Sequence, residues 1–350
     1  MAWDRAQAQA EADWLNGGVD PDDPVPCDPI PDGLNALVGS PPPFAEVVRP
    51  KLTTVRFAEG DEITLPDNPV MRPRYAFYRS RTGVMGGGTP LKSMGADQRR
   101  ALFAAAGVNE SDERVMCAVS SLEGGFDAIN TYDTGFVSVG FIQFACQSKG
   151  TGSLGALMLR YRTTNPKDFQ ADFRRYGIDV TDDGRLVAYD PDADVETVGA
   201  DAARTIIEQP RLAIVFQKAG RRDAFRVAQI RAAKEMYFPA DQDRISVKFP
   251  NRTESVAVRD VLFSEAGLAT LMDRKVHTGK LDAVAAAVSG VAAELNLLTV
   301  EDLKSYEGEI IARCQHRRDY LADPGLSQPA PTSRLRDSSK ASRGTKSGGG

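Results

Sequence analysis

The spacing of apolar residues predicts a mostly helical body that begins near residue 96. Apolar positions recur there every three or four residues, which is the period of one face of an α-helix. The first sixteen residues show the same spacing, which predicts a further short amphipathic helix carrying Trp3 and Trp14. In the body, the pattern predicts helices over the segments 96–106, 109–123, 153–164, 205–238 (one or two helices), 261–279, 281–298 and 299–321.

Short runs of β-branched residues predict only a small amount of β structure. Residues 51–65 form two such runs on either side of the Glu-Gly-Asp sequence at 59–61, which is typical of a hairpin. Residues 122–144, LEGGFDAINTYDTGFVSVGFIQF, join a helix end to an aromatic hairpin punctuated by glycines. The segment 185–199 is predicted as a loop or hairpin, and 246–260 as irregular chain. The predicted fold class is therefore mostly α (α+β).

Composition changes along the chain divide it into three predicted parts. Residues 17–50 are rich in proline, glycine and aspartate, which is typical of a linker or an extended arm. The last residues are basic and rich in serine and glycine, as in disordered tails. We therefore expect an N-terminal part with a helix, the arm and a short β segment (1–95), a helical domain (96–322) and a disordered basic tail (323–350).

The overall composition is that of a globular protein. The 350 residues are 42% hydrophobic and 26% charged, and the formal net charge of −5 argues against general nucleic-acid binding. No apolar run is long enough for a membrane span, and the start lacks the features of a secretory signal, so we expect a cytoplasmic product as synthesised. Four cysteines without a CxxC pair and only two histidines argue against a metal site. No metal or organic cofactor is predicted.

Glu123 and Asp133 are the candidate catalytic pair. Val115, Val119 and Leu122 form the apolar stripe of the helix, and Glu123 falls beside that stripe where the helix ends. Partial burial and the negative end of the helix dipole should raise the pKa of Glu123, so that it can donate a proton near neutral pH. A carboxylate in a polar turn, such as Asp133, should stay ionised. Glycoside hydrolysis needs this division between one acid and one carboxylate.

Further residues of the hairpin have side chains suited to a sugar substrate. Ser138 follows Asp133 by five residues, Gln143 adds a polar group, and Gly140 permits close approach to the backbone. Flat surfaces for sugar rings are expected from Tyr132, Phe136 and Phe141. The predicted catalytic set is Glu123, Asp133 and Ser138, and the predicted substrate-binding set is Tyr132, Phe136, Gly140 and Gln143.

The pattern Glu–Gly-Gly–aromatic, then a turn aspartate, then Ser-x-Gly resembles the lysozyme-like superfamily. The resemblance covers residues 112–145 and is nearest to phage muramidases (endolysins) and bacterial acetylmuramidases. It implies a helical domain with a small β-hairpin lining an active-site cleft, and a hydrolase that degrades the cell wall. In that family the glutamate is the general acid, which matches Glu123. The hairpin aspartate matches Asp133, and the hydroxyl residue that positions water matches Ser138, where threonine is usual.

Other interpretations stay open beside this one. A chitosanase or chitinase would share the helix-end glutamate. A non-catalytic lysozyme-like component of a phage tail or contractile injection system would instead bind the wall, or bind a partner protein through the N-terminal arm. Asp127, four residues after Glu123, is a competing second carboxylate that we interpret as structural.

Several single features have a plain structural interpretation. His277 lies near a helix end, where a capping role is expected over a catalytic one. The glycine-rich segment 84–90 lacks the lysine of a phosphate-binding loop, and the acidic run 190–194 is interpreted as a turn. The cysteines are expected to be free thiols, with a Cys117–Cys146 disulfide as the alternative.

Overall fold

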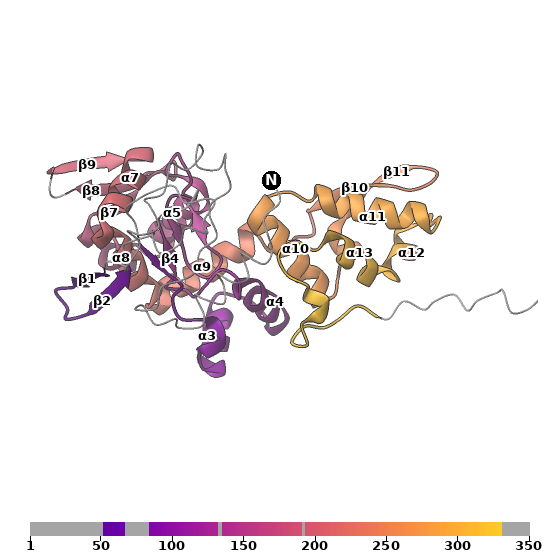
Figure 1. Cartoon of the computed structure of the whole chain (residues 1–350), viewed down its shortest axis with the longest axis horizontal. Coiled ribbons are helices and arrows are strands. Elements are labelled where there is room, and N and C mark those ends of the chain that lie inside the picture. Colours follow the sequence, from indigo (N-terminus) through magenta and orange to yellow (C-terminus); the bar gives the residue numbers. More distant parts are fainter. Residues whose placement is uncertain (1–51, 67–83, 132–134, 191–192, 331–350) are drawn as a thin grey trace, which may run out of the picture. The chain divides into compact units, whose positions relative to one another are not determined.

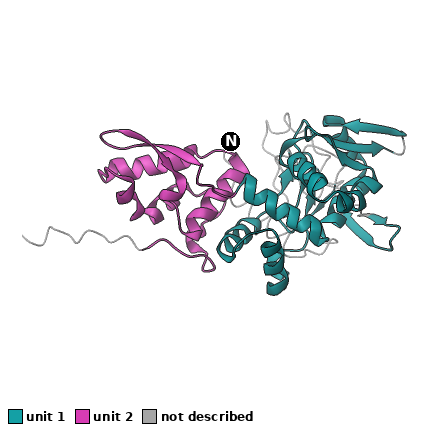
Figure 2. Ribbon diagram, turned by 180° about the vertical axis from the view of Figure 1, so that it is seen from behind, with its two compact units in different colours: residues 1–237 teal, residues 238–350 magenta. Residues whose placement is uncertain are grey.

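The structure is a computed structural model that describes residues 52–66, 84–131, 135–190 and 193–330 (Figure 1). The chain divides into two compact units, residues 1–237 and 238–350 (Figure 2). The boundary falls inside the segment 96–322, and the extent of the predicted lysozyme-like domain stays a prediction. The predicted N-terminal helix, the arm and residues 331–350 of the predicted tail lie outside the described residues.

Unit 1 combines helices with three small antiparallel sheets. Its strands are β1 (Leu52–Arg56), β2 (Glu62–Pro66), β3 (Met85–Gly86), β4 (Ile129–Asn130), β5 (Ser138–Val139), β6 (Phe144–Ala145), β7 (Ile178–Val180), β8 (Leu186–Asp190) and β9 (Val195–Val198). Its helices are α3 (Ala96–Ala105), α4 (Glu110–Ser120), α5 (Gly152–Thr164), α6 (Pro166–Asp172), α7 (Ala200–Glu208), α8 (Pro210–Gly220) and α9 (Asp223–Met236), with the 3-10 helices η3 (Leu91–Ser93) and η4 (Arg174–Tyr176).

The predicted hairpin at 51–65 is confirmed as the pair β1–β2. Arg56 lies opposite Glu62, and Gly60 adopts a φ of +95° in the turn between them, a conformation that favours glycine. The hairpin contacts the rest of unit 1 through Phe57, which is buried. The Phe57 ring meets Tyr176 of η4 edge-on, with 5.3 Å between ring centroids. The N-terminal segment thus contributes to the core of unit 1.

A cluster of aromatic rings explains why α5, α6, α8 and α9 pack together. The ring of Tyr161 on α5 lies 5.2 Å from that of Phe225 on α9, measured between centroids. Such ring pairs stabilise the packing beyond the burial of apolar surface, because the rings prefer particular relative orientations. The other buried rings of this cluster are Phe169, Phe173 and Phe216. These helices form the rigid framework against which the candidate site is built.

The segment 185–199 is a hairpin, β8–β9, as one of the two alternatives predicted. Strand β7 pairs with β8 to complete a three-stranded sheet, and Figure 1 shows α7 beside it. The Thr197 and Thr205 hydroxyls lie 3.0 Å apart, which joins β9 to α7. The predicted helical segment 205–238 contains the end of α7 and then α8 and α9, because Pro210 starts a new helix at its first position.

Unit 2 packs helices against one hairpin. Its elements are β10 (Arg244–Lys248), β11 (Thr253–Ala257), η5 (Val258–Asp260), α10 (Glu265–Thr278), α11 (Asp282–Glu294), α12 (Val300–Lys304), α13 (Glu307–Cys314) and η6 (Tyr320–Ala322). The prediction of irregular chain at 246–260 is wrong, because β10 and β11 pair there. Ile245 and Val247 are buried while Ser246 between them is exposed, which is the alternation of a half-buried strand.

The described residues establish a mixed α+β fold with more strand than the sequence predicted. In unit 1 the helices are interspersed with three small antiparallel sheets, and in unit 2 one hairpin precedes the helices. Within the described ranges no helix is long and apolar enough to cross a membrane. Three cysteines, Cys117, Cys146 and Cys314, are free thiols, so the alternative of a Cys117–Cys146 disulfide is excluded. The resemblance to the lysozyme-like fold stays a prediction.

Candidate functional site

Glu123 lies in the turn that directly follows α4. The Asn109 side chain caps the start of this helix by accepting a hydrogen bond from the Asp112 backbone N–H. The helix ends at Ser120, whose carbonyl accepts a hydrogen bond of 2.9 Å from the Glu123 N–H. Glu123 itself is half-buried. The Glu123 backbone therefore follows the last turn of α4, where the helix dipole is negative.

The two glycines after Glu123 pack directly against the glycine-rich segment 86–89. The Gly125 N–H donates a hydrogen bond of 2.8 Å to the Gly87 carbonyl. A Cβ at Gly125 would lie 2.1 Å from the Thr89 carbonyl oxygen, and a Cβ at Gly124 would lie 2.7 Å from that of Gly87. Only glycine fits such backbone contact. The segment 86–89 thus holds the chain that follows Glu123.

Asp127 has the structural role that we expected. Its carboxylate is 4% exposed and accepts a hydrogen bond of 2.7 Å from the Thr89 backbone N–H. The Arg221 guanidinium lies 3.7 Å from the other carboxylate oxygen. These contacts tie Asp127 to the glycine-rich segment and to the end of α8.

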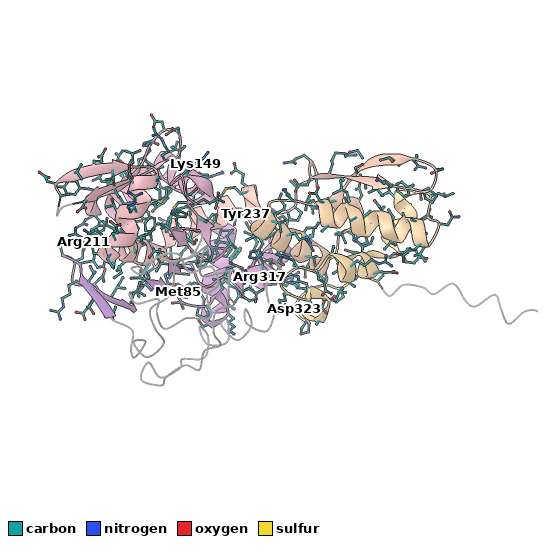
Figure 3. All side chains as sticks on the ribbon, turned by 45° about the horizontal axis from the view of Figure 1, so that its top comes forward. Met85, Lys149, Arg211, Tyr237, Arg317 and Asp323 are labelled. Atoms are coloured by element: carbon teal, nitrogen blue, oxygen red, sulfur yellow. The ribbon has the colours of Figure 1, made fainter. Side chains whose placement is uncertain are left out.

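Next to the contact between Asp127 and the glycine-rich segment lies a four-stranded sheet. Its strands have two residues each and follow the order β3-β4-β5-β6. Asn130 of β4 lies opposite Ser138 of β5, and Met85 of β3 lies opposite Asn130 on the other side. Directly opposed residues direct their side chains to the same face of a sheet. Asn130 and Ser138 therefore share one face, and they are 6% and 4% exposed. Met85 belongs to the edge strand β3 and is labelled in Figure 3.

The turn between β5 and β6 is tight. Gly140 has a φ of +84°, and the Gln143 backbone N–H and side-chain amide both donate hydrogen bonds to the Gly140 carbonyl, at 3.0 and 3.1 Å. Phe141 is fully buried, with its ring centroid 4.9 Å from that of Phe126. The expectation that Phe141 offers a flat surface to sugars is wrong, because its ring belongs to the core. Gln143 remains half-exposed.

Backbone conformations that ordinary residues avoid are concentrated in this segment. Five non-glycine residues among those described have a positive φ, and three of them lie here: Phe136 at 68°, Gln143 at 52° and Gln147 at 55°. Strained residues persist only where the surrounding structure fixes them, and they gather at functional sites. The segment 135–147 is therefore a candidate functional site on backbone geometry alone.

A buried side chain from α9 joins the two halves of the site. The Gln229 side-chain NH2 donates a hydrogen bond of 2.9 Å to the Phe126 carbonyl. Its amide oxygen accepts one of 3.3 Å from the Phe141 backbone N–H. We call this pair of hydrogen bonds the Gln229 bridge. It connects the chain that follows Glu123 to the chain that follows Ser138.

The predicted site residues are only partly within the described structure. Glu123, Phe136, Ser138, Gly140 and Gln143 are described, whereas Tyr132 and Asp133 lie outside the described residues. The structure pairs Ile129 and Asn130, which follow the Glu123 turn, with the strand that carries Ser138. The catalytic and substrate-binding roles of the predicted site residues stay predictions.

Sequence reasoning missed Asn130, Gln229 and the role of the segment 86–89. Asn130 could have been found from the sequence, because it is a polar residue only three positions before Asp133. The three consecutive glycines at 86–88 were noted, but only in connection with phosphate binding. Gln229 gave no local signal, because its partners are 103 and 88 positions away along the chain.

Other candidate chemistry is excluded or lies elsewhere. Burial raises the pKa of the Cys117 thiol to about 12 and that of Cys314 to about 11, so neither is a thiolate nucleophile at neutral pH. In unit 2, the His277 imidazole Nε2 lies 3.2 Å from Asp273 and 3.0 Å from the Arg317 guanidinium. No group of three or more metal-ligating side chains occurs among the described residues.

No protein-family model, curated protein or solved structure matches this chain. The function is therefore argued from the site itself.

Proposed function

We propose that this protein is a muramidase, a peptidoglycan hydrolase that cleaves β-1,4 glycosidic bonds with Glu123 as general acid. The observation that carries the proposal is the position of Glu123. It lies half-buried in the turn at the end of α4, and the two glycines after it pack against the segment 86–89, which continues from strand β3 of the sheet that contains Ser138. The cluster of strained residues at 136–147 supports the same location.

The proposed role requires Glu123 to be protonated before the glycosidic bond breaks. Partial burial and the negative end of the α4 dipole both disfavour a negative charge on Glu123. In the proposed reaction, Glu123 gives its proton to the glycosidic oxygen while the bond from that oxygen to the anomeric carbon breaks. Asp133 then stabilises the positively charged sugar or activates the water that adds to it. Ser138 orients this water through its hydroxyl.

The sheet supplies further polar groups on the face that carries Ser138. Asn130 lies directly opposite Ser138 in the register of β4 and β5. Asn130 is 6% exposed, so its amide lies in the protein interior beside Ser138.

Digestion of purified peptidoglycan tests the proposal. We expect the wild type to release new reducing-end muramic sugars, detected by mass spectrometry, and Glu123→Gln to release none while keeping its circular dichroism spectrum. Glu110→Gln is the matched control, since Glu110 is an exposed carboxylate at the other end of the same helix. We expect it to retain full activity.

The other outcomes separate the alternatives. Cleavage of chitosan and not of peptidoglycan would make the protein a chitosanase with the same acid. An inactive wild type that still sediments with cell walls would favour the non-catalytic wall-binding or assembly component. The burial of Ser138, at 4% exposed, is the one observation that favours this second candidate.

A further inference from the structure

The Gln229 bridge is the only described side-chain connection between Phe126 and Phe141 that runs through α9. Gln229 is completely buried, in the middle of that helix. Phe126 follows Glu123 by three residues, and Phe141 follows Ser138 by three residues. The two segments also pair directly, through β4 with β5 and through the rings of Phe126 and Phe141. The Gln229 amide adds a connection from α9 to both of them.

The surrounding backbone is shaped around this amide. At Gly140, a Cβ would lie 2.1 Å from the Gln229 Oε1 atom, so a side chain there would displace the amide. On the other side, a Cβ at Gly220 of α8 would lie 2.3 Å from the Phe126 carbonyl oxygen. Glycine at both positions allows α8, α9 and the β5–β6 turn to approach the bridge closely. The position of the amide is thus fixed from two sides.

Both hydrogen bonds of the bridge satisfy backbone groups in a buried region. Removing the amide would leave the Phe126 carbonyl and the Phe141 N–H without these partners, which is costly in a buried place. The backbone would then move to find other partners or water. Such movement would change the spacing between the Glu123 turn and the Ser138 strand.

We infer that Gln229 is a positioning residue, which sets the distance between the Glu123 turn and the Ser138 strand without touching substrate. This inference rests on the proposed function for its effect on catalysis. A displacement of about 1 Å in a catalytic group can cost about 10²-fold in rate. We therefore expect loss of the bridge to lower kcat and to leave KM nearly unchanged.

Two substitutions of Gln229 distinguish the effect of its hydrogen bonds from the effect of its packing. Gln229→Met has a similar volume and can form neither hydrogen bond. Gln229→Glu has the same shape, and as a neutral carboxylic acid it can donate to the Phe126 carbonyl and accept from the Phe141 N–H. As a carboxylate it has no hydrogen to donate. Only the protonated form of this variant restores the bridge.

The full-length variants are compared with the wild type in steady-state kinetics on soluble peptidoglycan fragments. We expect Gln229→Met to lower kcat by about 10²-fold. We expect the kcat of Gln229→Glu, relative to the wild type at each pH, to rise as the pH falls and the carboxyl becomes protonated. A purely structural role would lower the unfolding midpoint without producing this pH profile in kcat.

Gln217→Met is the matched control. Gln217 is also a buried glutamine, at 6% exposed, on the neighbouring helix α8. It takes no part in the Gln229 bridge. We expect its substitution to leave kcat unchanged, even where it lowers stability.

Amide hydrogen exchange tests the bridge independently of any activity. We expect faster exchange in the peptides covering 124–131 and 138–145 for Gln229→Met, and wild-type exchange there for Gln217→Met. If the wild type proves inactive, the proposed function fails, and the exchange result still decides whether the bridge positions the two segments. Unchanged exchange, or faster exchange with wild-type kcat in an active enzyme, would overturn the inference.

Discussion

Gly125 lies so close to the backbone of Thr89 that a methyl group does not fit. A Cβ there would be 2.1 Å from the Thr89 carbonyl oxygen. We expect Gly125→Ala to lower the free energy of unfolding by about 1–3 kcal/mol, as overpacking does in a close-packed region. Urea unfolding followed by circular dichroism would measure this change.

Gly87→Ala provides the control for this prediction. It lies in the same contact, but a Cβ at Gly87 would meet no atom within 4 Å. We expect its effect on unfolding to be much smaller than that of Gly125→Ala. Equal effects would mean that the glycine contact does not set the position of the chain after Glu123.

The residues of the candidate site differ in how far their positions could be predicted from sequence. Glu123 could be placed because the helical period of α4 and the glycines after it are local signals. Gln229 could not, since its role depends on backbone groups that are 103 and 88 positions away. Phe141 was misplaced for a related reason: in a short turn, the pattern does not tell which aromatic ring faces the core.

Helix α4 carries Glu123 at its end, and its own start depends on one side chain. The Asn109 side chain accepts a hydrogen bond of 2.9 Å from the Asp112 N–H. We expect Asn109→Ala to lower the free energy of unfolding by about 0.5–2 kcal/mol, because an N-terminal backbone donor loses its partner. Chemical denaturation would test this value.

Asn109→Ser keeps a capping oxygen and serves as the matched variant. We expect it to unfold at nearly the wild-type denaturant concentration. A loss as large as that of the alanine variant would show that Asn109 stabilises α4 by something other than its cap.

Helices and strands were predicted correctly where the element was long enough for its spacing of apolar residues to repeat. The β1–β2 hairpin has five-residue strands around a glycine turn, and it was predicted. Strands β3 to β6 have two residues each, which is too short for any alternation to show. The β10–β11 hairpin was missed although Ile245 and Val247 alternate with polar residues.

The two units of the whole molecule differ in their content of histidine. Both histidines of the chain, His277 and His316, lie in unit 2. Burial lowers the pKa of His316, and the nearby His277, Arg274 and Arg317 lower it further, whereas Asp273 opposes them. Figure 3 labels Arg317 in this unit. Mild acid should therefore act differently on the two units.

We expect His316 to make unit 2 less stable as the pH falls. A histidine whose folded pKa is depressed binds its proton more readily when unfolded, so its stabilising contribution is present above the unfolded pKa and declines below it. Between about pH 7.5 and pH 5.5, the free energy of opening in unit 2 should fall more in the wild type than in His316→Gln. Hydrogen exchange, corrected for the intrinsic rate at each pH, would measure it.

The comparison with His316→Gln is needed because Glu307 in the same unit acts in the opposite direction. Burial raises the pKa of Glu307, so its folded form takes up a proton more readily and gains stability as the pH falls. This contribution is common to both proteins and cancels in the difference. Identical pH dependence in the two proteins would contradict the role assigned to His316.

The Gln229 bridge also has a consequence for the order of events during translation. Synthesis proceeds from the N-terminus, and domains generally fold as their chain emerges. Phe126 and Phe141 are made long before Gln229, which follows Phe126 by 103 positions. A nascent chain that ends before α9 contains both β4 and β5, which can pair, but it lacks the Gln229 bridge. The proposed catalytic centre would be completed only when the ribosome has passed the last helix of unit 1, so a prematurely terminated product would carry the acid without this buried amide.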